Sequence, residues 1–225
     1  NDAEESYARA TVLNPNYFNA HRNLSVIRME RGRLNEAEKS SRRALSLSPS
    51  CAEAHYNLGV VLQKLGRPTE AEASFLRAIE LQPDYAKAHD YLGISLQEQG
   101  RLEEATLSHR LGISFKSDDA EANYNLGIVL QKLGRFDEAL ADYNKVLSLK
   151  PDYEVALNNR GNVLQELGRF DDALADFDRA IYIKPDYEVA LNNRGNVLQA
   201  LRRFDDALDD YEKAISHKPE YADAH

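Results

Sequence analysis

Residues 120–153 read AEANYNLGIVLQKLGRFDEALADYNKVLSLKPDY, a stretch of 34 residues that divides into two halves. In the first half, apolar residues recur at helical spacing up to Leu133, and Gly134 follows where helices commonly end in a left-handed residue. The second half starts at Phe136, shows helical spacing again, and stops before Pro151, which cannot continue a helix. The stretch therefore predicts two amphipathic helices joined by a short turn.

The same pattern recurs along the chain with a period of 34 residues. Alanine occupies one repeat position without a gap, and proline occupies another with a single gap: Ala3, Ala37, Ala71, Ala105, Ala139, Ala173 and Ala207; Pro15, Pro49, Pro83, Pro151, Pro185 and Pro219. A fixed period of this length indicates a solenoid, in which helical hairpins stack and share a core that no single hairpin could bury. We therefore expect an all-α superhelix of about 13 helices without strands.

Ten of the eleven glycines fall at two repeat positions. The first is a close-contact site in the first helix of each hairpin, and the second is the turn between the helices: Gly59, Gly93, Gly127, Gly161 and Gly195; Gly32, Gly66, Gly100, Gly134 and Gly168. Both roles are structural, so none of these glycines is expected to form a phosphate-binding loop.

A residue that favours a helix N-cap precedes each first helix: Asn16, Ser50, Asp84, Asp118, Asp152 and Asp186. We expect their side-chain oxygens to accept backbone N–H groups of the first turn, each contributing about 1 kcal/mol. Ser50 with Glu53, and Asp118 with Glu121, also have the spacing of a capping box.

The third repeat departs from the others. Ser117 replaces the closing proline, His109 replaces a large aromatic residue, and Gly112 replaces a small alanine. Each change removes a contact that the other repeats keep. We therefore expect its second helix, about 103–116, to open before its neighbours.

Three arginines stand where the other repeats have a different residue type. Arg202 replaces the turn glycine in the last full repeat, and Arg160 and Arg194 occupy a position filled elsewhere by leucine. For Arg160 and Arg194 two arrangements are open: the stems pack while the charged heads reach solvent, or the heads face the groove.

These residues resemble the signature of the tetratricopeptide repeat family. Residues 52–85 show it at seven positions: Leu58, Gly59, Leu62, Ala71, Phe75, Ala78 and Pro83. The resemblance covers nearly the whole chain and implies a right-handed α-α superhelix. It predicts a single array over residues 1–225, made of a half repeat, six full repeats and the start of another: 1–17; 18–51, 52–85, 86–119, 120–153, 154–187 and 188–221; 222–225.

The composition limits the partners and the compartment. The formal net charge is −9, and an acidic surface repels phosphate backbones, so nucleic acid is not an expected partner. No apolar run reaches the roughly 18 residues that a membrane span needs, so no membrane partner is expected either. The single cysteine, Cys51, excludes an internal disulfide and favours a reducing compartment, the cytoplasm. The chain starts inside a repeat and without Met, so we expect it to be part of a longer one.

The resemblance implies that first helices line a concave groove, and amide side chains recur on them. Asparagine fills one groove position in five of six repeats, glutamine fills a second in five of six, and the last two repeats add four more amides: Asn23, Asn57, Asn125, Asn159 and Asn193; Gln63, Gln97, Gln131, Gln165 and Gln199; Asn158, Asn192, Asn162 and Asn196. Amides both donate and accept hydrogen bonds, so a row of them can hold an extended peptide backbone whatever its side chains. The row is similar to that in the tetratricopeptide half of O-GlcNAc transferase and Spindly-type protein glycosyltransferases.

The amide row has two further possible origins besides peptide binding. Asparagine and glutamine are common on helix surfaces, and duplication alone would copy them, as the near-verbatim recurrence of 151–174 at 185–208 illustrates. In either case the amides are expected to be exposed. Replacing Asn125, Asn159 and Asn193 with alanine should then leave folding nearly intact.

A chaperone-tail clamp is a rival binding mode within the family. Arg22, Asn57 and Lys87 fill three of its five places, but Val26 and Tyr91 fill the other two. The clamp is therefore incomplete, and we do not expect it to operate.

Neither catalysis nor metal binding is expected. Four histidines share one repeat position: His21, His55, His89 and His225. This spacing makes a ladder rather than a cluster, so packing accounts for them better than a shared metal does. Paired aspartates open two second helices, where negative charge complements the helix dipole: Asp171–Asp172 and Asp205–Asp206. We expect no cofactor, no metal and no catalytic residue.

The leading hypothesis is therefore a protein–protein interaction scaffold that binds an extended peptide or a partner protein in its concave groove. The alternative is the substrate-recognition region of a protein O-glycosyltransferase whose catalytic domain lies outside this chain. A third hypothesis is weak end-to-end self-association through exposed terminal half-repeats.

Overall fold

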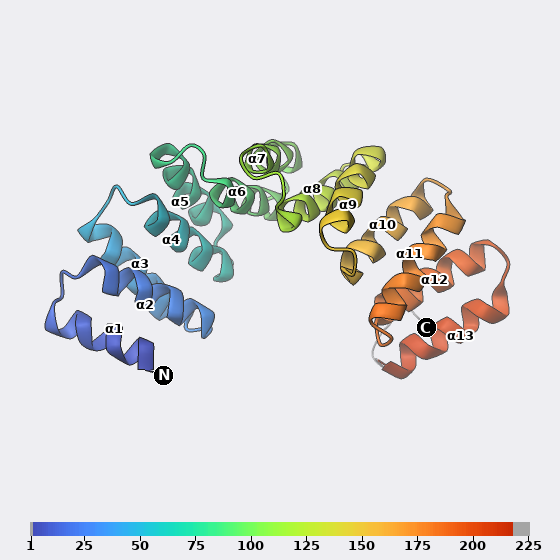
Figure 1. The fold of residues 1–225 in the computed structure, drawn as a ribbon, viewed down its shortest axis with the longest axis horizontal. Coiled ribbons are helices and arrows are strands. Elements are labelled where there is room, and N and C mark those ends of the chain that lie inside the picture. The colour runs from blue at the N-terminus through green and yellow to red at the C-terminus, as the bar shows by residue number, and fades with distance from the viewer. Residues whose placement is uncertain (1, 218–225) are drawn as a thin grey trace. The chain divides into compact units, whose positions relative to one another are not determined.

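The computed structural model describes residues 2–217, and in that range it contains 13 helices and no strand, as the period predicts (Figure 1). The helices are α1 Asp2–Leu13, α2 Phe18–Glu30, α3 Leu34–Leu47, α4 Ala52–Lys64, α5 Pro68–Leu81, α6 Ala86–Glu98, α7 Leu102–Phe115, α8 Ala120–Lys132, α9 Phe136–Leu149, α10 Glu154–Glu166, α11 Phe170–Ile183, α12 Glu188–Ala200 and α13 Phe204–His217. The repeat expected to start at 222–225 lies outside the described residues. None of the helices in the described range combines the length and apolarity that a bilayer crossing needs.

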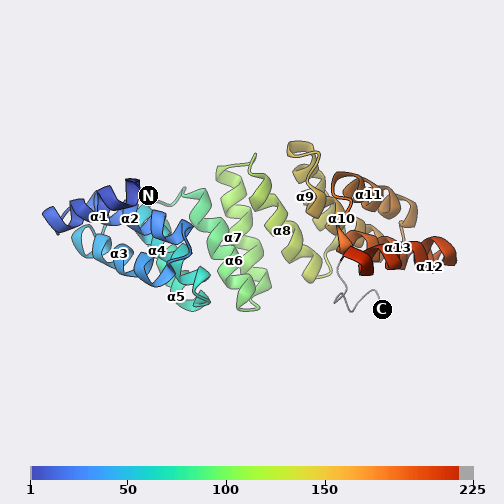
Figure 2. The same ribbon diagram turned by 90° about the horizontal axis from the view of Figure 1, so that it is seen from below.

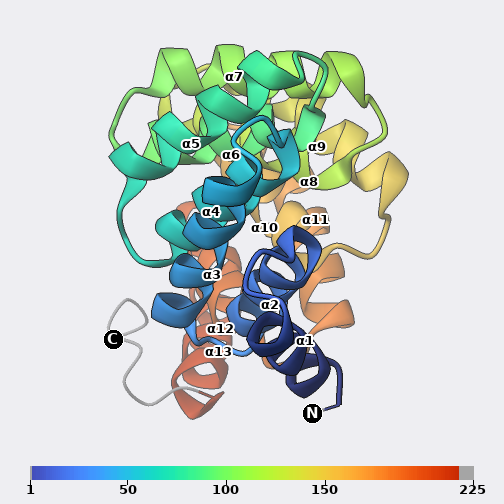
Figure 3. The same ribbon diagram turned by 90° about the vertical axis from the view of Figure 1, so that its left-hand side faces the viewer.

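Packing divides the chain into two compact units, Asn1–Ser117 and Asp118–His225. Within each unit, every first helix packs on the second helix of its own repeat and on the second helix of the repeat before it. Figures 1 and 2 both show α6 and α7 side by side as such a hairpin, and Figure 3 views the first unit from the end where α1 and α2 lie. Each unit is thus a stack of α-α hairpins.

An aromatic ring covers the close-contact glycine in most hairpins. A Cβ atom added to Gly127 would lie 2.7 Å from Cε1 of Tyr143, and one added to Gly59 would lie 2.5 Å from Cε1 of Phe75. Both rings are fully buried, so they have no space into which to retreat. The glycines are therefore needed for close contact, as the sequence predicts, and the partner is a ring rather than a backbone.

In the third repeat, His109 takes the place of the ring over Gly93. Its imidazole is fully buried, and its Nδ1 lies 2.6 Å from Oδ1 of Asp90. Helix α7 is 14 residues long, like the other complete second helices, so the missing proline does not extend it. That α7 opens before its neighbours stays a prediction.

The predicted N-caps are wrong by one residue. The N-cap residues of the first helices are Tyr17, Cys51, Tyr85, Asp119, Tyr153 and Tyr187, so the expected residues, including Ser50 and Asp118 of the two proposed capping boxes, lie in the preceding turn. Tyrosine at this position packs on the preceding repeat instead of capping: the ring centroids of Tyr153 and Tyr124 are 5.3 Å apart. Only Asp119 acts as a side-chain cap among these first helices, because it accepts from the backbone N–H groups of Glu121 and Ala122.

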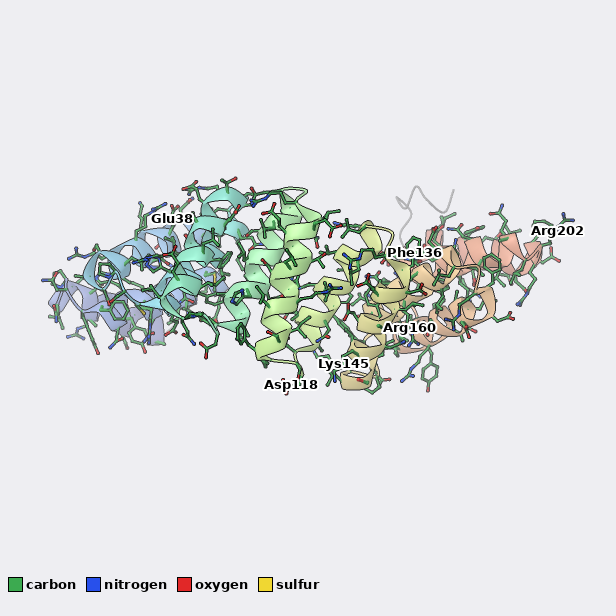
Figure 4. All side chains as sticks on the ribbon, turned by 90° about the horizontal axis from the view of Figure 1, so that it is seen from above. Glu38, Asp118, Phe136, Lys145, Arg160 and Arg202 are labelled. Atoms are coloured by element: carbon green, nitrogen blue, oxygen red, sulfur yellow. The ribbon has the colours of Figure 1, made fainter. Side chains whose placement is uncertain are left out.

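The first unit ties neighbouring repeats together with ion pairs. A glutamate of each second helix receives the arginine that precedes the next second helix: Glu4 with Arg33, Glu38 with Arg67, and Glu72 with Arg101. Burial acts against ionisation of Glu38, but hydrogen bonds from Arg42 and Arg67 outweigh it and lower its pKa. Glu38 lies on α3, as Figure 4 shows.

The second unit lacks this glutamate. Leucine stands at the same repeat position, as Leu140, Leu174 and Leu208, and Leu140 is buried. Arg169 and Arg203, which match Arg67 in the repeat, pair with Asp172 and Asp206 of their own second helices. Neighbouring repeats are therefore joined by different contacts in the two units.

The turn glycines Gly32, Gly66, Gly100, Gly134 and Gly168 have φ between +71° and +78°, and Arg202 has φ +61° at the equivalent place (Figure 4). This left-handed region costs a residue with a Cβ atom roughly 1–2 kcal/mol. We expect Arg202→Gly to raise the free energy of unfolding by about 1 kcal/mol, after allowing for the greater chain entropy of glycine. Urea denaturation measures it, and the reverse change Gly168→Arg is the matched control. An Arg202→Gly midpoint equal to or below that of the parent chain would contradict backbone strain at Arg202.

Candidate functional site: the face of the first helices

The first helices form a continuous wall in each unit. Helix α4 contacts both α2 and α6, and α10 contacts both α8 and α12. In the second unit, clefts of about 260 and 220 Å³ lie on the opposite side, between α9 and α11 and between α11 and α13. The first helices are therefore the more closely packed side, and we take their outward face as the candidate site.

Asparagine side chains link neighbouring first helices across this wall. The amide of Asn159 on α10 donates to the hydroxyl of Tyr124 on α8 at 3.0 Å, and the amide of Asn193 on α12 donates to Oδ1 of Asn158 on α10 at 2.9 Å. In both cases an asparagine donates to the residue before its counterpart in the previous repeat. We call this series of contacts the amide ladder.

The ladder changes one expectation from the sequence. Asn159 and Asn193 each make a hydrogen bond that joins two repeats, so replacing them with alanine should lower stability by about 0.5–1.5 kcal/mol per bond. Part of the recurrence of asparagine therefore has a structural cause that neither surface solubility nor peptide binding supplies.

Asn57 shows what happens where the ladder has no acceptor. Its side chain is buried, and its Nδ2 atom has no hydrogen-bond partner among the described residues. The residue that should accept from it is Arg22, whose guanidinium only donates and pairs instead with Glu53 at 2.8 Å. Of the three places that matched the chaperone-tail clamp, Arg22 is thus engaged within the protein and Asn57 is buried.

The predicted groove residues fall into three classes of burial. Asn57, Asn158 and Asn192 are buried; Asn23, Asn125, Asn159, Asn193, Asn162, Gln63, Gln97, Gln131 and Gln165 are half-buried; Asn196 and Gln199 are exposed. Several glutamines also contact their own unit: Gln63 donates to Glu98 at 3.3 Å, and Gln131 accepts from the hydroxyl of Tyr143 at 3.0 Å. The amides are therefore a mixed set, and only some of them lie open to a ligand.

Four of these amides form an accessible group on α10 and α12, which we call the amide patch: Asn162, Gln165, Asn196 and Gln199. Residues three apart on a helix share a face, and α10 and α12 are in contact, so two amides from each helix lie near each other. Asn196 and Gln199 accept from the hydroxyl of Tyr211 at 2.9 and 3.4 Å through their oxygens. Their amide N–H groups have no acceptor among the described residues.

Tyrosines of the first unit form a cluster that the sequence analysis did not identify. The ring of Tyr56 lies 5.2 Å from that of Tyr85 and 5.4 Å from that of Tyr91, measured between centroids. Burial raises the pKa of Tyr85 to about 12 and that of Tyr56 further, so both hydroxyls stay neutral at ordinary pH. Tyr91 stands where other repeats have the ladder asparagine, and this exchange of an amide for a ring was the available signal.

Arg160 and Arg194 point away from this face, between second helices. Arg160 makes two hydrogen bonds to the carboxylate of Asp176, at 2.5 and 2.7 Å, and one to Oδ1 of Asn144 at 2.6 Å (Figure 4). Arg194 binds Asp210 and Asp178 in the same way, and the hydrogen bond to Asp210 raises its pKa further. The heads are neither in solvent nor in the groove.

The histidine ladder has a packing role in the described residues. Nε2 of His21, His55 and His89 lies 3.0, 2.9 and 2.9 Å from the carbonyl oxygens of Pro15, Pro49 and Pro83. His225 lies outside the described residues. No group of three His, Cys, Asp or Glu side chains in the described range could hold a metal ion.

Comparisons with known proteins agree on the kind of repeat. The family model described as Tetratricopeptide repeat matches residues 52–85, 120–153, 155–187 and 189–221. Two related models, described as TPR repeat and Tetratricopeptide repeat, match residues 26–66 and 74–106. The segments of the first model follow the repeat boundaries read from the period. No curated protein matches the chain.

Solved structures share the fold at low sequence identity. PilW, a type IV pilus biogenesis factor, has a TM-score of 0.84 and 21% identity, over 92% of this chain and 96% of that one. Pseudomonas aeruginosa pilF has a TM-score of 0.80 and 21% identity, over 92% and 94%. YrrB, a TPR protein with an unusual peptide-binding site, has a TM-score of 0.68 and 26% identity, over 84% and 97%.

Proposed function

This chain belongs to the tetratricopeptide repeat family, and from that premise we propose that it is a non-catalytic scaffold that binds an extended peptide segment of a partner protein on the face of its first helices. The amide patch is the observation that carries the proposal. It places four neutral amides on neighbouring helices, and the N–H groups of Asn196 and Gln199 have no acceptor among the described residues. These groups are available to a ligand.

The chemistry of the patch fits a peptide backbone. An extended backbone presents both N–H and C=O groups, and an amide side chain can pair with either. Because the patch is uncharged, it selects for backbone rather than for acidic or basic side chains. The similarity to YrrB, a TPR protein with an unusual peptide-binding site, supports this proposal.

We expect peptides selected from a random phage-displayed library on the intact chain to depend on the amide patch. Asn162→Ala with Asn196→Ala should weaken such a peptide by about 0.5–1.5 kcal/mol per lost hydrogen bond, measured by isothermal titration calorimetry. The loss should change little between low and high salt, because no charge is involved. The melting temperature should stay close to that of the parent chain.

The amide ladder provides the matched control. Asn159→Ala with Asn193→Ala removes the same number of amides from the same two helices, but these amides bridge repeats. This variant should melt at a lower temperature and keep its peptide affinity. Equal affinities for the parent chain and the patch variant would exclude the patch as the binding site.

The alternative, a substrate-recognition region of a protein O-glycosyltransferase, uses the same face in a related way. Such a region would hold an extended peptide that carries the acceptor hydroxyl. The library separates the two proposals: selected peptides enriched in Ser and Thr would favour the alternative, and peptides without that enrichment would favour a general scaffold.

A further inference from the structure

The step from one repeat to the next in the second unit uses a fixed set of contacts. The later first helix supplies two consecutive residues, Asn193 and Arg194. The earlier repeat receives them with Oδ1 of Asn158, at 2.9 Å, and with the carboxylate of Asp178, at 2.5 Å. Each step therefore joins an amide and a guanidinium on one side to two acceptors on the other.

Helices α12 and α13 present the same acceptors once more without donors. Asn192 matches Asn158 in the repeat, is buried, and its Oδ1 has no hydrogen-bond partner among the described residues. Glu212 matches Asp178 and is exposed on α13. A buried carbonyl oxygen without a donor is unfavourable, so this site calls for an N–H group.

Apolar side chains surround these acceptors and are also uncovered. Leu208 is 56% exposed, whereas its counterpart Leu140 is 8% exposed beneath the following repeat. Phe204 is 61% exposed, whereas its counterpart Phe170 is half-buried. The end formed by α12 and α13 thus has the composition of a repeat-to-repeat interface rather than that of a solvated surface.

We propose that this end is a second binding surface that docks one helix carrying an amide residue followed directly by arginine, as the first helix of a further repeat of this type does. The amide N–H pairs with Oδ1 of Asn192, the guanidinium pairs with Glu212, and the apolar side of the helix covers Leu208 and Phe204. The order of the two residues matters, because the acceptors lie on α12 and α13 respectively. This surface is separate from the amide patch and does not depend on the proposed function.

The test extends the chain by a copy of residues 188–221 placed after residue 221, so that the added first helix carries the Asn–Arg pair in register. Amide hydrogen exchange of residues 204–217 should slow at least tenfold relative to the parent chain. Changing the added asparagine to alanine should return roughly 2- to 12-fold of that protection, the effect of one lost hydrogen bond. Glu212→Ala should speed exchange in the extended chain and leave the parent chain unchanged.

Two outcomes would overturn the proposal. Equal protection by the added helix with asparagine and with alanine, and no effect of Glu212→Ala, would show that any apolar cover suffices. Self-association of the parent chain that Glu212→Ala abolishes, detected by sedimentation against concentration, would instead assign the surface to a second copy. Both readouts are independent of peptide binding, so they do not decide the role of the amide patch.

Discussion

Replacing Arg160 with leucine is expected to lower the free energy of unfolding by about 3–5 kcal/mol. Arg160 holds the carboxylate of Asp176 with two hydrogen bonds, and the Asp176 side chain is only 8% exposed. Without the guanidinium, a charged carboxylate stays buried with no cation to compensate it. The loss is far larger than that of a surface ion pair, which seldom exceeds about 1 kcal/mol.

The chain itself provides the compensating change. Earlier repeats have leucine and serine at the two positions, as Leu58 with Ser74, and Ser74 satisfies its hydroxyl with the carbonyl of Glu70 at 3.1 Å. Arg160→Leu with Asp176→Ser should therefore recover most of the lost stability. Urea denaturation of both single variants and of the double variant measures the coupling. Additive losses in the double variant would contradict the pairing.

We expect Gly127→Leu to destabilise the chain by at least ~1–3 kcal/mol, the range for an overpacked core. Its Cβ alone would lie 2.7 Å from Cε1 of Tyr143, a fully buried ring, and a leucine adds three further carbons. No rotamer avoids the ring, because the two helices hold it directly over the glycine. Thermal or urea unfolding measures the effect.

Ala141→Leu is the control for Gly127→Leu, because it adds a similar bulk at an exposed position of α9. It should leave the unfolding midpoint nearly unchanged, since leucine is a good helix former and meets only solvent. If both variants unfolded alike, the ring over Gly127 would not be the constraint.

The sequence predicts the fold well because each repeat carries the same pattern in several independent ways. The period, the turn glycines and the buried alanines each indicate helical hairpins, and all of them reappear in α2–α13 of the described residues. Ala71 and Ala139 are fully buried, as their fixed repeat positions suggest. Handedness and the continuity of a single array over 1–225 stay predictions.

The caps and the candidate site were harder to predict, because they depend on which neighbour a side chain meets. Asp152 has the composition of an N-cap, but the ring of Tyr153 packs on Tyr124 and the helix starts one residue later. Asn159 has the sequence context of a surface amide, yet it bonds to Tyr124 of the repeat before it. The pairing of Arg160 with Asp176, sixteen residues away, becomes visible only when the hairpin closes. These contacts cross helices, so a repeat position alone does not reveal them.

The different ties between repeats in the two units restrict how such a protein can be lengthened by gene duplication. A repeat of the second kind needs an acceptor ahead of its arginine, as Asn144 and Asp178 provide for Arg160 and Arg194. The equivalent positions of α3 and α5 hold Arg42 and Leu76, which accept nothing. A copy of 154–187 can therefore follow itself, as the near-identical 188–221 does, but inserted after α3 it would set two guanidinium groups against each other. The modules are interchangeable within one half of the chain and directional across it.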